Sequence, residues 1–545
     1  MRRRGGWSAI GLTLLLAWVV AYPLVAVFAE AGRADLGAFL RDGLEWRALW
    51  GSLWTSAASV ALAGALGIPL AFVFERYDFP GRRVLGALVA LPAVMPPLVG
   101  VIAFLFLYGE SGFVARFVQF VTGSRSSLWR LQGAGAILLV HAYSMYVYFY
   151  LFVRAGLARL DASALEAAAS LGAGPLETFR RVTLPLLRPA LVGAALLTFM
   201  TSLASFSAPY VFGGGFRVMT TQIVATRLNG DVATAMLETA TLTVLALVGF
   251  ALVQWTERRG SVAAVGKGTP PALRAIRGPL ARAGAAAAGW FLAALLLLPH
   301  ATLVLISLVP LNSWTVETLP PVLSLVNYRR LVTEVERLRP MLNSLWMAAV
   351  ATAAALAAAV WAGHLVTRRP GPGRTARAIE VLLALPWAVP GTVLAIALAT
   401  LFSVHRPLAG RFVLVGTALL LPLAYTVRNL PLAGRAVLAG FRQLDPALDE
   451  AAQSLGAGRW SRLARVTLPL LRPALAAGGA LAFVTALGDF VASILLYTFE
   501  TRPISIEILS SLRFNDLGVA AAFGVVLMLV SGAALGVGAR VGGGR

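Results

Sequence analysis

Apolar segments long enough to cross a bilayer recur along this chain of 545 residues. A membrane-spanning helix needs about 20 predominantly apolar residues for a hydrocarbon layer of roughly 30 Å. Backbone in lipid must satisfy its own hydrogen bonds, so these segments are expected to be helices. They cover residues 7–29, 52–74, 84–107, 134–153, 190–211, 236–256, 284–309, 343–367, 379–402, 412–432, 473–498 and 516–538. The sequence therefore predicts an all-α polytopic membrane protein with about 12 transmembrane helices.

The charged residues lie between these segments and indicate how the chain is oriented. Only 13% of residues are charged, yet the net charge is +22. The Lys and Arg residues are concentrated in alternate connections, as the positive-inside rule requires when both termini are cytoplasmic. This distribution indicates anionic lipid headgroups of the bilayer, and not nucleic acid, as the partner of the positive charge. The absence of cysteine excludes disulfides and thiolate metal sites.

Two halves of the sequence repeat each other. Residues 161–191 align without gaps on 445–475, and both copies run on to "RVTLPLLRPAL". Three further pairs keep the same order: "GSLWTSAA" with "NSLWMAAV", "ALPAVMPPLVG" with "ALPWAVPGTVL", and "SLASFSAP" with "ALGDFVAS". We expect two six-helix repeats, 1–256 and 284–545, which have the same orientation because each crosses the membrane an even number of times. Residues 257–283, basic and interrupted by Gly and Pro, are expected to form a cytoplasmic linker.

The part of the sequence that is most alike in the two halves predicts a helix-turn-helix between the fourth and fifth helix of each half. Asp161 and Asp445 are suitable N-caps of a short helix, which Gly172 and Gly456 would end in a left-handed conformation. A second short helix then leads into the membrane. Two equivalent loops suggest a partner with two equivalent binding sites; a purely structural amphipathic hairpin is the alternative.

"EAA", then Gly, then "LP", at these spacings, resembles the EAA loop of permease subunits of binding-protein-dependent ABC importers. The resemblance covers nearly the whole chain, as a fused double permease. It implies that loops 161–185 and 445–469 seat in two copies of a cytoplasmic ABC ATPase, and that a periplasmic binding protein delivers the substrate at the bacterial inner membrane. The ATPase-coupling residues that it implies are Glu166, Ala167, Ala168, Gly172, Glu450, Ala451, Ala452 and Gly456.

The chain itself is not expected to be an enzyme. A Walker A loop places a Lys followed by Ser or Thr on the nucleotide phosphates, whereas Lys267 stands in "GKGTPP". ATP and Mg²⁺ would therefore bind to the partner ATPase, and we expect this chain to bind no cofactor. Its histidines are scattered near segment ends, so we expect no metal site either.

Prolines and one acidic residue mark candidate positions along the transmembrane path. A proline inside a helix removes a hydrogen bond and kinks it, which in a membrane is tolerated where protein or a cavity satisfies the backbone. The candidates for pore-lining breaks in the third helix of each half are Pro92, Pro96, Pro97, Pro386 and Pro390; a packing kink is the alternative. Asp489 and its repeat mate Ser205 are further pore candidates, with capping of a local helix break as the alternative for Asp489.

The sequence says less about the substrate. In this family the external binding protein holds the selectivity, so the permease carries little information on its cargo. A fused chain of this length, with "YGESG" after the third helix, looks like the ferric-iron and thiamine branches. We expect ferric iron, with thiamine or another small solute as alternatives. A secondary transporter, which also uses duplicated halves and broken helices, is the alternative from another class.

Overall fold

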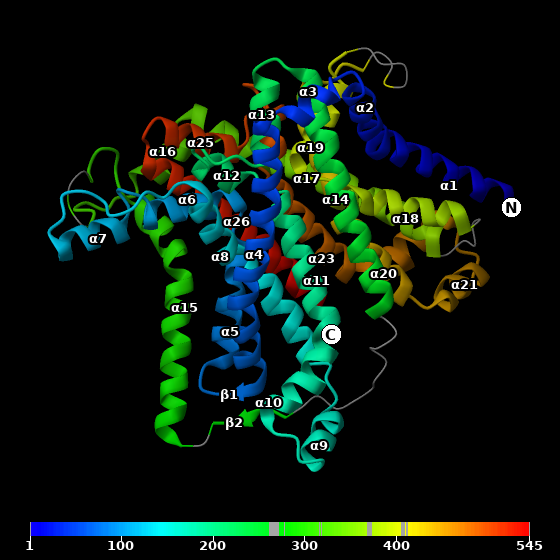
Figure 1. Cartoon of the computed structure of the whole chain (residues 1–545). Helices are drawn as coiled ribbons and strands as arrows, with labels where there is room; N and C mark the ends of the chain where they lie inside the picture. Colours follow the sequence, from blue (N-terminus) through cyan, green and yellow to red (C-terminus); the bar gives the residue numbers. More distant parts are fainter. Residues whose placement is uncertain are drawn as a thin grey trace.

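A computed structural model describes residues 2–260, 272–276, 278–314, 317, 319–367, 373–404, 409 and 412–543. Almost all of this part of the chain is helical (Figure 1). Its strands are β1 (Tyr77–Asp78) and β2 (Arg274–Ala275), which form a parallel pair that attaches the chain between the halves to the first repeat. The architecture is therefore the all-α one that the apolar segments predict.

The helices of the first half follow in this order: α1 (Arg2–Leu16), a π-helical turn (Ala17–Ala21), α2 (Tyr22–Ala31), α3 (Leu36–Arg41), α4 (Gly43–Arg76), α5 (Arg82–Ala90), a 3₁₀ turn (Leu91–Val94), α6 (Pro97–Tyr108), α7 (Phe113–Thr122), α8 (Gly133–Leu157), α9 (Ala162–Ser170), α10 (Pro175–Thr178), a π-helical turn (Phe179–Thr183), α11 (Leu184–Leu203), α12 (Ser207–Phe212), α13 (Met219–Leu228) and α14 (Val232–Gly260).

The second half repeats this pattern with α15 (Pro279–Ser307), α16 (Val326–Thr333), α17 (Val335–Thr367), α18 (Gly373–Ala388), α19 (Gly391–Leu401), α20 (Leu420–Gln443), α21 (Pro446–Ser454), α22 (Arg459–Arg462), a π-helical turn (Leu463–Thr467), α23 (Leu468–Leu487), α24 (Val491–Leu496), α25 (Ile504–Arg513) and α26 (Leu517–Gly543).

The number of helices that meet the requirements of a membrane span is slightly below the expected 12. Within the described residues, ten helical segments are long and apolar enough, or eleven if the bent pair α18 and α19 counts as one span. The expected segment 412–432 does not qualify, because α20 begins only at Leu420 and carries Arg428, Asn429 and Arg435. Those polar side chains lower its hydropathy, and Arg428 pairs within the protein, as described below.

Equivalent hydrogen bonds show that the two repeats fold alike. On α4, the Ser52 hydroxyl accepts the backbone N–H of Met219, which begins α13 (2.8 Å). On α17, the Ser344 hydroxyl accepts the N–H of Ile504, which begins α25, at the same distance. Both serines belong to the repeated "SLW" sequence. The repeat in sequence is therefore a repeat in structure, down to single side chains.

The two repeats exchange their first helices. Helices α1 and α2 of the first repeat pack against α18 and α19 of the second repeat. Helix α15 of the second repeat in turn packs against α5 and α6 of the first. The largest hydrophobic core consequently contains residues of both repeats, including Leu12 of α1 and Phe523 of α26. From this common region the repeats diverge: the first runs down toward α9 and the second runs to the right toward α21 (Figure 1).

The predicted linker 257–283 is described only in part. Residues 257–260 continue α14, residues 274–275 form β2, and α15 begins at Pro279. Residues 261–271 and 277, which include Lys267, lie outside the described residues. The predicted boundaries of the repeats at 256 and 284 fall near the end of α14 and the start of α15, and they stay a prediction.

Candidate coupling loops and transmembrane path

Both predicted helix-turn-helix loops are present and have the same hydrogen bonds. The Asp161 carboxylate caps α9 by accepting the Ser163 N–H (3.0 Å), and the Asp445 carboxylate caps α21 by accepting the Ala447 N–H (2.9 Å). At the other ends, the N–H of Ala173 donates to the Ala168 carbonyl and that of Ala457 to the Ala452 carbonyl, each at 3.0 Å. This is the hydrogen bond of a Schellman C-cap.

The glycines of these C-caps hold the left-handed conformation that the sequence predicts. Gly172 has φ +81° and Gly456 has φ +82°. A Cβ atom added at either position would meet nothing within 4 Å. The backbone conformation favours glycine here, and the space around it is open.

The surface of both loops is exposed, and it carries apolar side chains. Neither α9 nor α21 has a buried residue. Leu171 and Leu455, the residues just before the two glycines, are each 88% exposed. The predicted coupling residues share this surface: Ala168 and Ala452 are half-buried, and the others are exposed, namely Glu166, Ala167, Gly172, Glu450, Ala451 and Gly456. Exposed apolar groups at two equivalent tips are typical of docking surfaces.

Each loop is continuous with the fifth helix of its repeat. In the π-helical turn of the first repeat, Leu184 donates its N–H to the Phe179 carbonyl, five residues back, and Leu468 donates equivalently to Leu463. The next residue is proline in both copies, Pro185 and Pro469, and it has no N–H to donate. The helix continues through the wider π turn and this proline without ending. Movement of either loop would consequently be transmitted to α11 or α23.

The third helix of each half is broken at the predicted prolines. In the first half, Pro92 lies in the 3₁₀ turn after α5, Pro96 caps α6, and Pro97 is its first residue. In the second half, Pro386 lies near the end of α18 and Pro390 caps α19. The axes of α18 and α19 differ by 110°. The breaks are part of the structure, and their pore-lining role stays a prediction.

Asp489 stabilises a break in the fifth helix, between α23 and α24, and also forms an ion pair. Its Oδ1 accepts the Ala492 N–H (2.8 Å) at the start of α24, and its Oδ2 lies 2.7 Å from Nη1 of Arg428 on α20. A Cβ atom at Gly391, the first residue of α19, would lie 2.2 Å from that same Nη1. Arg428 thus connects Asp489 with the break in the third helix. The geometry agrees with the capping alternative for Asp489, and pore lining stays a prediction.

Ser205, the repeat mate of Asp489, belongs to a neutral cluster instead. Its hydroxyl lies 2.9 Å from Nε2 of His141. The Nδ1 atom of this buried histidine lies 2.9 Å from the Ser59 hydroxyl and 3.1 Å from that of Ser202. In the second repeat, Tyr425 occupies the position equivalent to His141. The two repeats therefore differ in charge where their fifth helices break.

Two phenylalanines, which the sequence argument does not select, bring the repeats into contact. Phe206 and Phe490 are 1% and 2% exposed, and their ring centroids are 5.8 Å apart. The Tyr210 ring packs on both of them, with centroid distances of 5.1 Å and 5.8 Å. Phe490 lies 284 residues after Phe206, the same offset that separates Glu166 from Glu450. A contact between equivalent residues marks the pseudo-twofold axis of the molecule.

Comparison with known proteins identifies the family. The profile of the binding-protein-dependent transport system inner membrane component matches residues 63–261 and 355–540. The chain belongs to this family. Each match covers one loop and the broken third and fifth helices of that repeat, so the duplicated structure corresponds to two copies of the family domain.

Several curated relatives are fused permeases that match nearly the whole of this chain. A probable ABC transporter permease protein, y4fN of Sinorhizobium fredii, is 34% identical over 96% of this chain and 93% of its own length. The ferric transport system permease protein FbpB of Actinobacillus pleuropneumoniae is 27% identical over 96% of this chain and 76% of its own length. The thiamine transport system permease protein ThiP of Escherichia coli is 28% identical over 96% and 95%, respectively.

The chain is therefore an ABC importer permease, a multi-pass protein of the inner membrane and a component of transport and not an enzyme. This result excludes the alternative of a secondary transporter. Within the described residues no group of three or more His, Asp or Glu is arranged to hold a metal ion.

Proposed function

We propose that this chain is the membrane subunit of an importer driven by two copies of a separate cytoplasmic ATPase, which dock on the loops 161–185 and 445–469. The observation that carries the proposal is the pair of loops with identical capping and identical C-caps. Two equal copies of one partner need two equal surfaces. With six crossings in each repeat, as the sequence predicts, both termini would then lie in the cytoplasm, on the side of the loops.

The continuity of each loop with its fifth helix supports a mechanical role. The helix α11 runs from the first loop to Leu203, and α23 runs from the second loop to Leu487. Phe206 and Phe490 follow three residues later, and in this proposal they close the path where the two repeats meet. Closure of the ATPase dimer on ATP would move the two loops, and the fifth helices would carry the two phenylalanines apart.

The substrate that we propose is ferric iron, delivered by a periplasmic binding protein. Ferric permeases are among the relatives that match over most of this chain. A thiamine permease matches nearly end to end as well, so thiamine is the second candidate.

Replacement of the two loop glycines tests the docking role. Asparagine tolerates the left-handed conformation, so Gly172→Asn with Gly456→Asn should leave the free loops folded while adding side chains to the proposed contact. We expect ATP-driven uptake by the reconstituted transporter to fall by at least about tenfold, with normal membrane insertion; a loss of about 1.4 kcal/mol in a required contact is sufficient. The matched control is Gly230→Asn, which has φ +89°, open space and a position far from the loops. Wild-type uptake by the double variant would contradict docking at these loops.

The substrate is tested on the binding protein encoded beside this permease. A rise in its unfolding temperature with ferric iron, but not with thiamine or thiamine phosphates, is the expected result. A response to thiamine alone would replace the substrate and leave the mechanism unchanged.

A further inference from the structure

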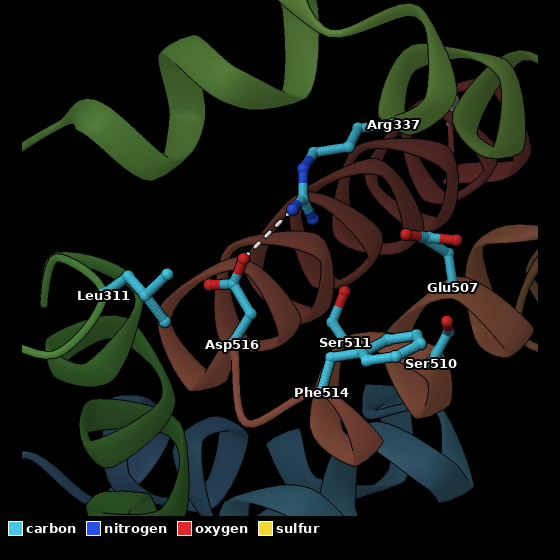
Figure 2. Close-up of a pocket in the computed structure, with 7 residues that line it drawn as sticks. All are labelled: Leu311, Arg337, Glu507, Ser510, Ser511, Phe514 and Asp516. Atoms are coloured by element: carbon cyan, nitrogen blue, oxygen red, sulfur yellow. Dashed lines mark hydrogen bonds and ion pairs between the residues drawn. The ribbon is translucent and has the colours of Figure 1, made fainter.

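A cavity of about 250 Å³ lies at the end of the second repeat that is far from the loops. Its walls come from the chain after α15, from the start of α17, and from α25 with the turn that follows it (Figures 1 and 2). The residues that line it are Leu311, Arg337, Glu507, Ser510, Ser511, Phe514 and Asp516. If the loops face the cytoplasm, this cavity opens toward the binding protein.

Three buried oxygen atoms of the cavity have no hydrogen-bond donor. They are Oγ of Ser511, Oδ1 of Asp516 and Oε2 of Glu507, and their residues are only 3%, 5% and 7% exposed. Figure 2 shows these side chains around one space. Buried polar atoms are nearly always hydrogen-bonded, so three acceptors around one cavity indicate a ligand that donates.

Two of the neighbouring arginines pair with other carboxylate oxygens, and a third forms an ion pair with Glu507. Arg337 pairs with Glu334 and lies 3.0 Å from Oδ2 of Asp516, and Arg330 lies 3.0 Å from the same oxygen. The Arg502 Nε lies 3.2 Å from Glu507 Oε2, without the geometry of a hydrogen bond.

The charges around the cavity leave an excess of carboxylate. Burial raises the pKa of Glu507, and the negative charges of Glu336 and Asp516 raise it further. The positive charges of Arg502 and Arg337 lower it, but by less. Among the residues that line the cavity, two carboxyl groups, of Glu507 and Asp516, stand beside one guanidinium, that of Arg337. A positively charged ligand would favour the ionised form of Glu507.

Apolar side chains form the mouth of the cavity. Phe514 is 82% exposed and Leu311 is 46% exposed. Phe514 is followed by Asn515, which has φ +58°, and Leu311 by Asn312, which also has φ +58°. These are the non-glycine residues with positive φ in the described chain. The backbone on both sides is thus held in an uncommon conformation that presents an aromatic and an aliphatic group to solvent.

The residues of the first repeat that correspond to Glu507 and Asp516 are hydrogen-bonded within the protein. There Gln222, the counterpart of Glu507, donates to Glu45 (3.0 Å) and accepts from Arg217 (2.7 Å). Asp231, the counterpart of Asp516, is exposed and caps α14 through the Thr234 N–H. Unpartnered acceptors remain there too, Oε2 of Glu45 on α4 and Oε2 of Glu238 on α14. They do not belong to the residues equivalent to Glu507, Ser511 and Asp516, so the two repeats place their open acceptors differently.

We propose that this cavity receives one basic side chain, Lys or Arg, of the docked binding protein. Its charged end would donate to Ser511, Asp516 and Glu507, and its aliphatic stem would pack on Leu311 and Phe514. An aromatic side chain also attracts a cation. The proposal rests on the proposed function, and it assigns to the second repeat a contact that fixes the orientation of an asymmetric partner on a pseudosymmetric permease.

The test uses the reconstituted transporter with its ATPase and the neighbouring binding protein. Phe514→Ala and Ser511→Ala leave the ion pairs of Asp516 intact. We expect the KM for the binding protein in ATPase stimulation to rise about tenfold in Phe514→Ala and about fivefold in Ser511→Ala, with unchanged activity at saturation. Asn229→Ala, the equivalent of Phe514 in the first repeat, is the matched control and should keep the wild-type KM.

Substitution of the binding protein's surface Lys and Arg residues by Met completes a double-mutant cycle. One such change should raise KM in the wild-type permease and have little further effect in Phe514→Ala. Wild-type KM in both permease variants would overturn the proposal. It would also be overturned if methylguanidinium stabilised the permease through Ser511 without competing with the binding protein, because the cavity would then hold a small cation. No stimulation of the wild-type transporter by the binding protein would instead contradict the proposed function.

Discussion

The two repeats have the same helix caps at their loops and differ where their fifth helices break. At the loops, Asp161 and Asp445 form the same caps and Gly172 and Gly456 the same C-caps. At the breaks, Ser205 contacts a histidine, whereas Asp489 forms an ion pair with Arg428. The symmetry of the molecule is thus retained at one end and lost in the middle.

The proposed partners explain this difference. Two copies of one ATPase would require similar surfaces, so the caps that shape the two loops are the same. A single substrate that passes between the repeats would contact both at once, and it has no such symmetry itself. The two sides of the path could therefore differ, as could an outer face that would receive one binding protein.

The largest effect on stability is expected from removing the charge that only the second repeat has. Arg428→Ala would leave the buried Asp489 carboxylate without its counter-ion, which we expect to cost about 3 kcal/mol of stability. Ser144→Ala, at the equivalent position of the first repeat, removes only a hydroxyl bonded to the Val140 carbonyl and should cost less than about 1 kcal/mol. Unfolding temperatures in detergent measure both.

Removal of both charges distinguishes the ion pair between Arg428 and Asp489 from the capping of α24 by Asp489. In Arg428→Met with Asp489→Asn, the amide oxygen can still accept the Ala492 N–H, so most of the stability should return. Equal unfolding temperatures for Arg428→Ala and Ser144→Ala would show that the ion pair has no structural role. Asp489→Asn alone should change the uptake rate if the carboxylate lines the path, and wild-type uptake would favour the capping role.

The helices, the repeat and the loops could be predicted because they depend on local patterns. Apolar length, an Asp before a short helix and a Gly after it can be read without knowing the neighbours. The pairing of Arg428 with Asp489 could not, since it joins two helices of unknown packing; the charge inside segment 412–432 was the available signal. The sequence repeat shows that Phe206 and Phe490 are equivalent residues, each directly after Ser205 or Asp489. Their contact follows only from the way the repeats face each other.

Truncation of Phe206 or Phe490 tests whether the two phenylalanines close the transmembrane path together. Because each ring packs on the other and on Tyr210, Phe206→Ala and Phe490→Ala should each cost about 2–3 kcal/mol of stability. Both should also increase the passive leak of small ions from liposomes without ATP. Phe199→Ala, a half-buried phenylalanine on α11 before the break, is the control and should not leak. A leak from only one of the two variants would contradict a shared closure on the axis.

The smallest effect is expected at a polar difference between the two loops. In the second loop, Arg462 of α22 hydrogen-bonds to Gln453 and lies 3.8 Å from Asp449, which ties α22 to α21. The first loop has Thr178 in the equivalent place, with only a weak hydrogen bond to the Ala173 carbonyl (3.5 Å). Arg462→Ala should therefore cost about 0.5–1 kcal/mol and speed hydrogen exchange of the Ala457 amide about two- to fivefold, while Thr178→Ala leaves the Ala173 amide unchanged. If exchange is equally unaffected in both variants, the Schellman caps alone hold the loops, and the symmetry of the two docking surfaces extends to their stability.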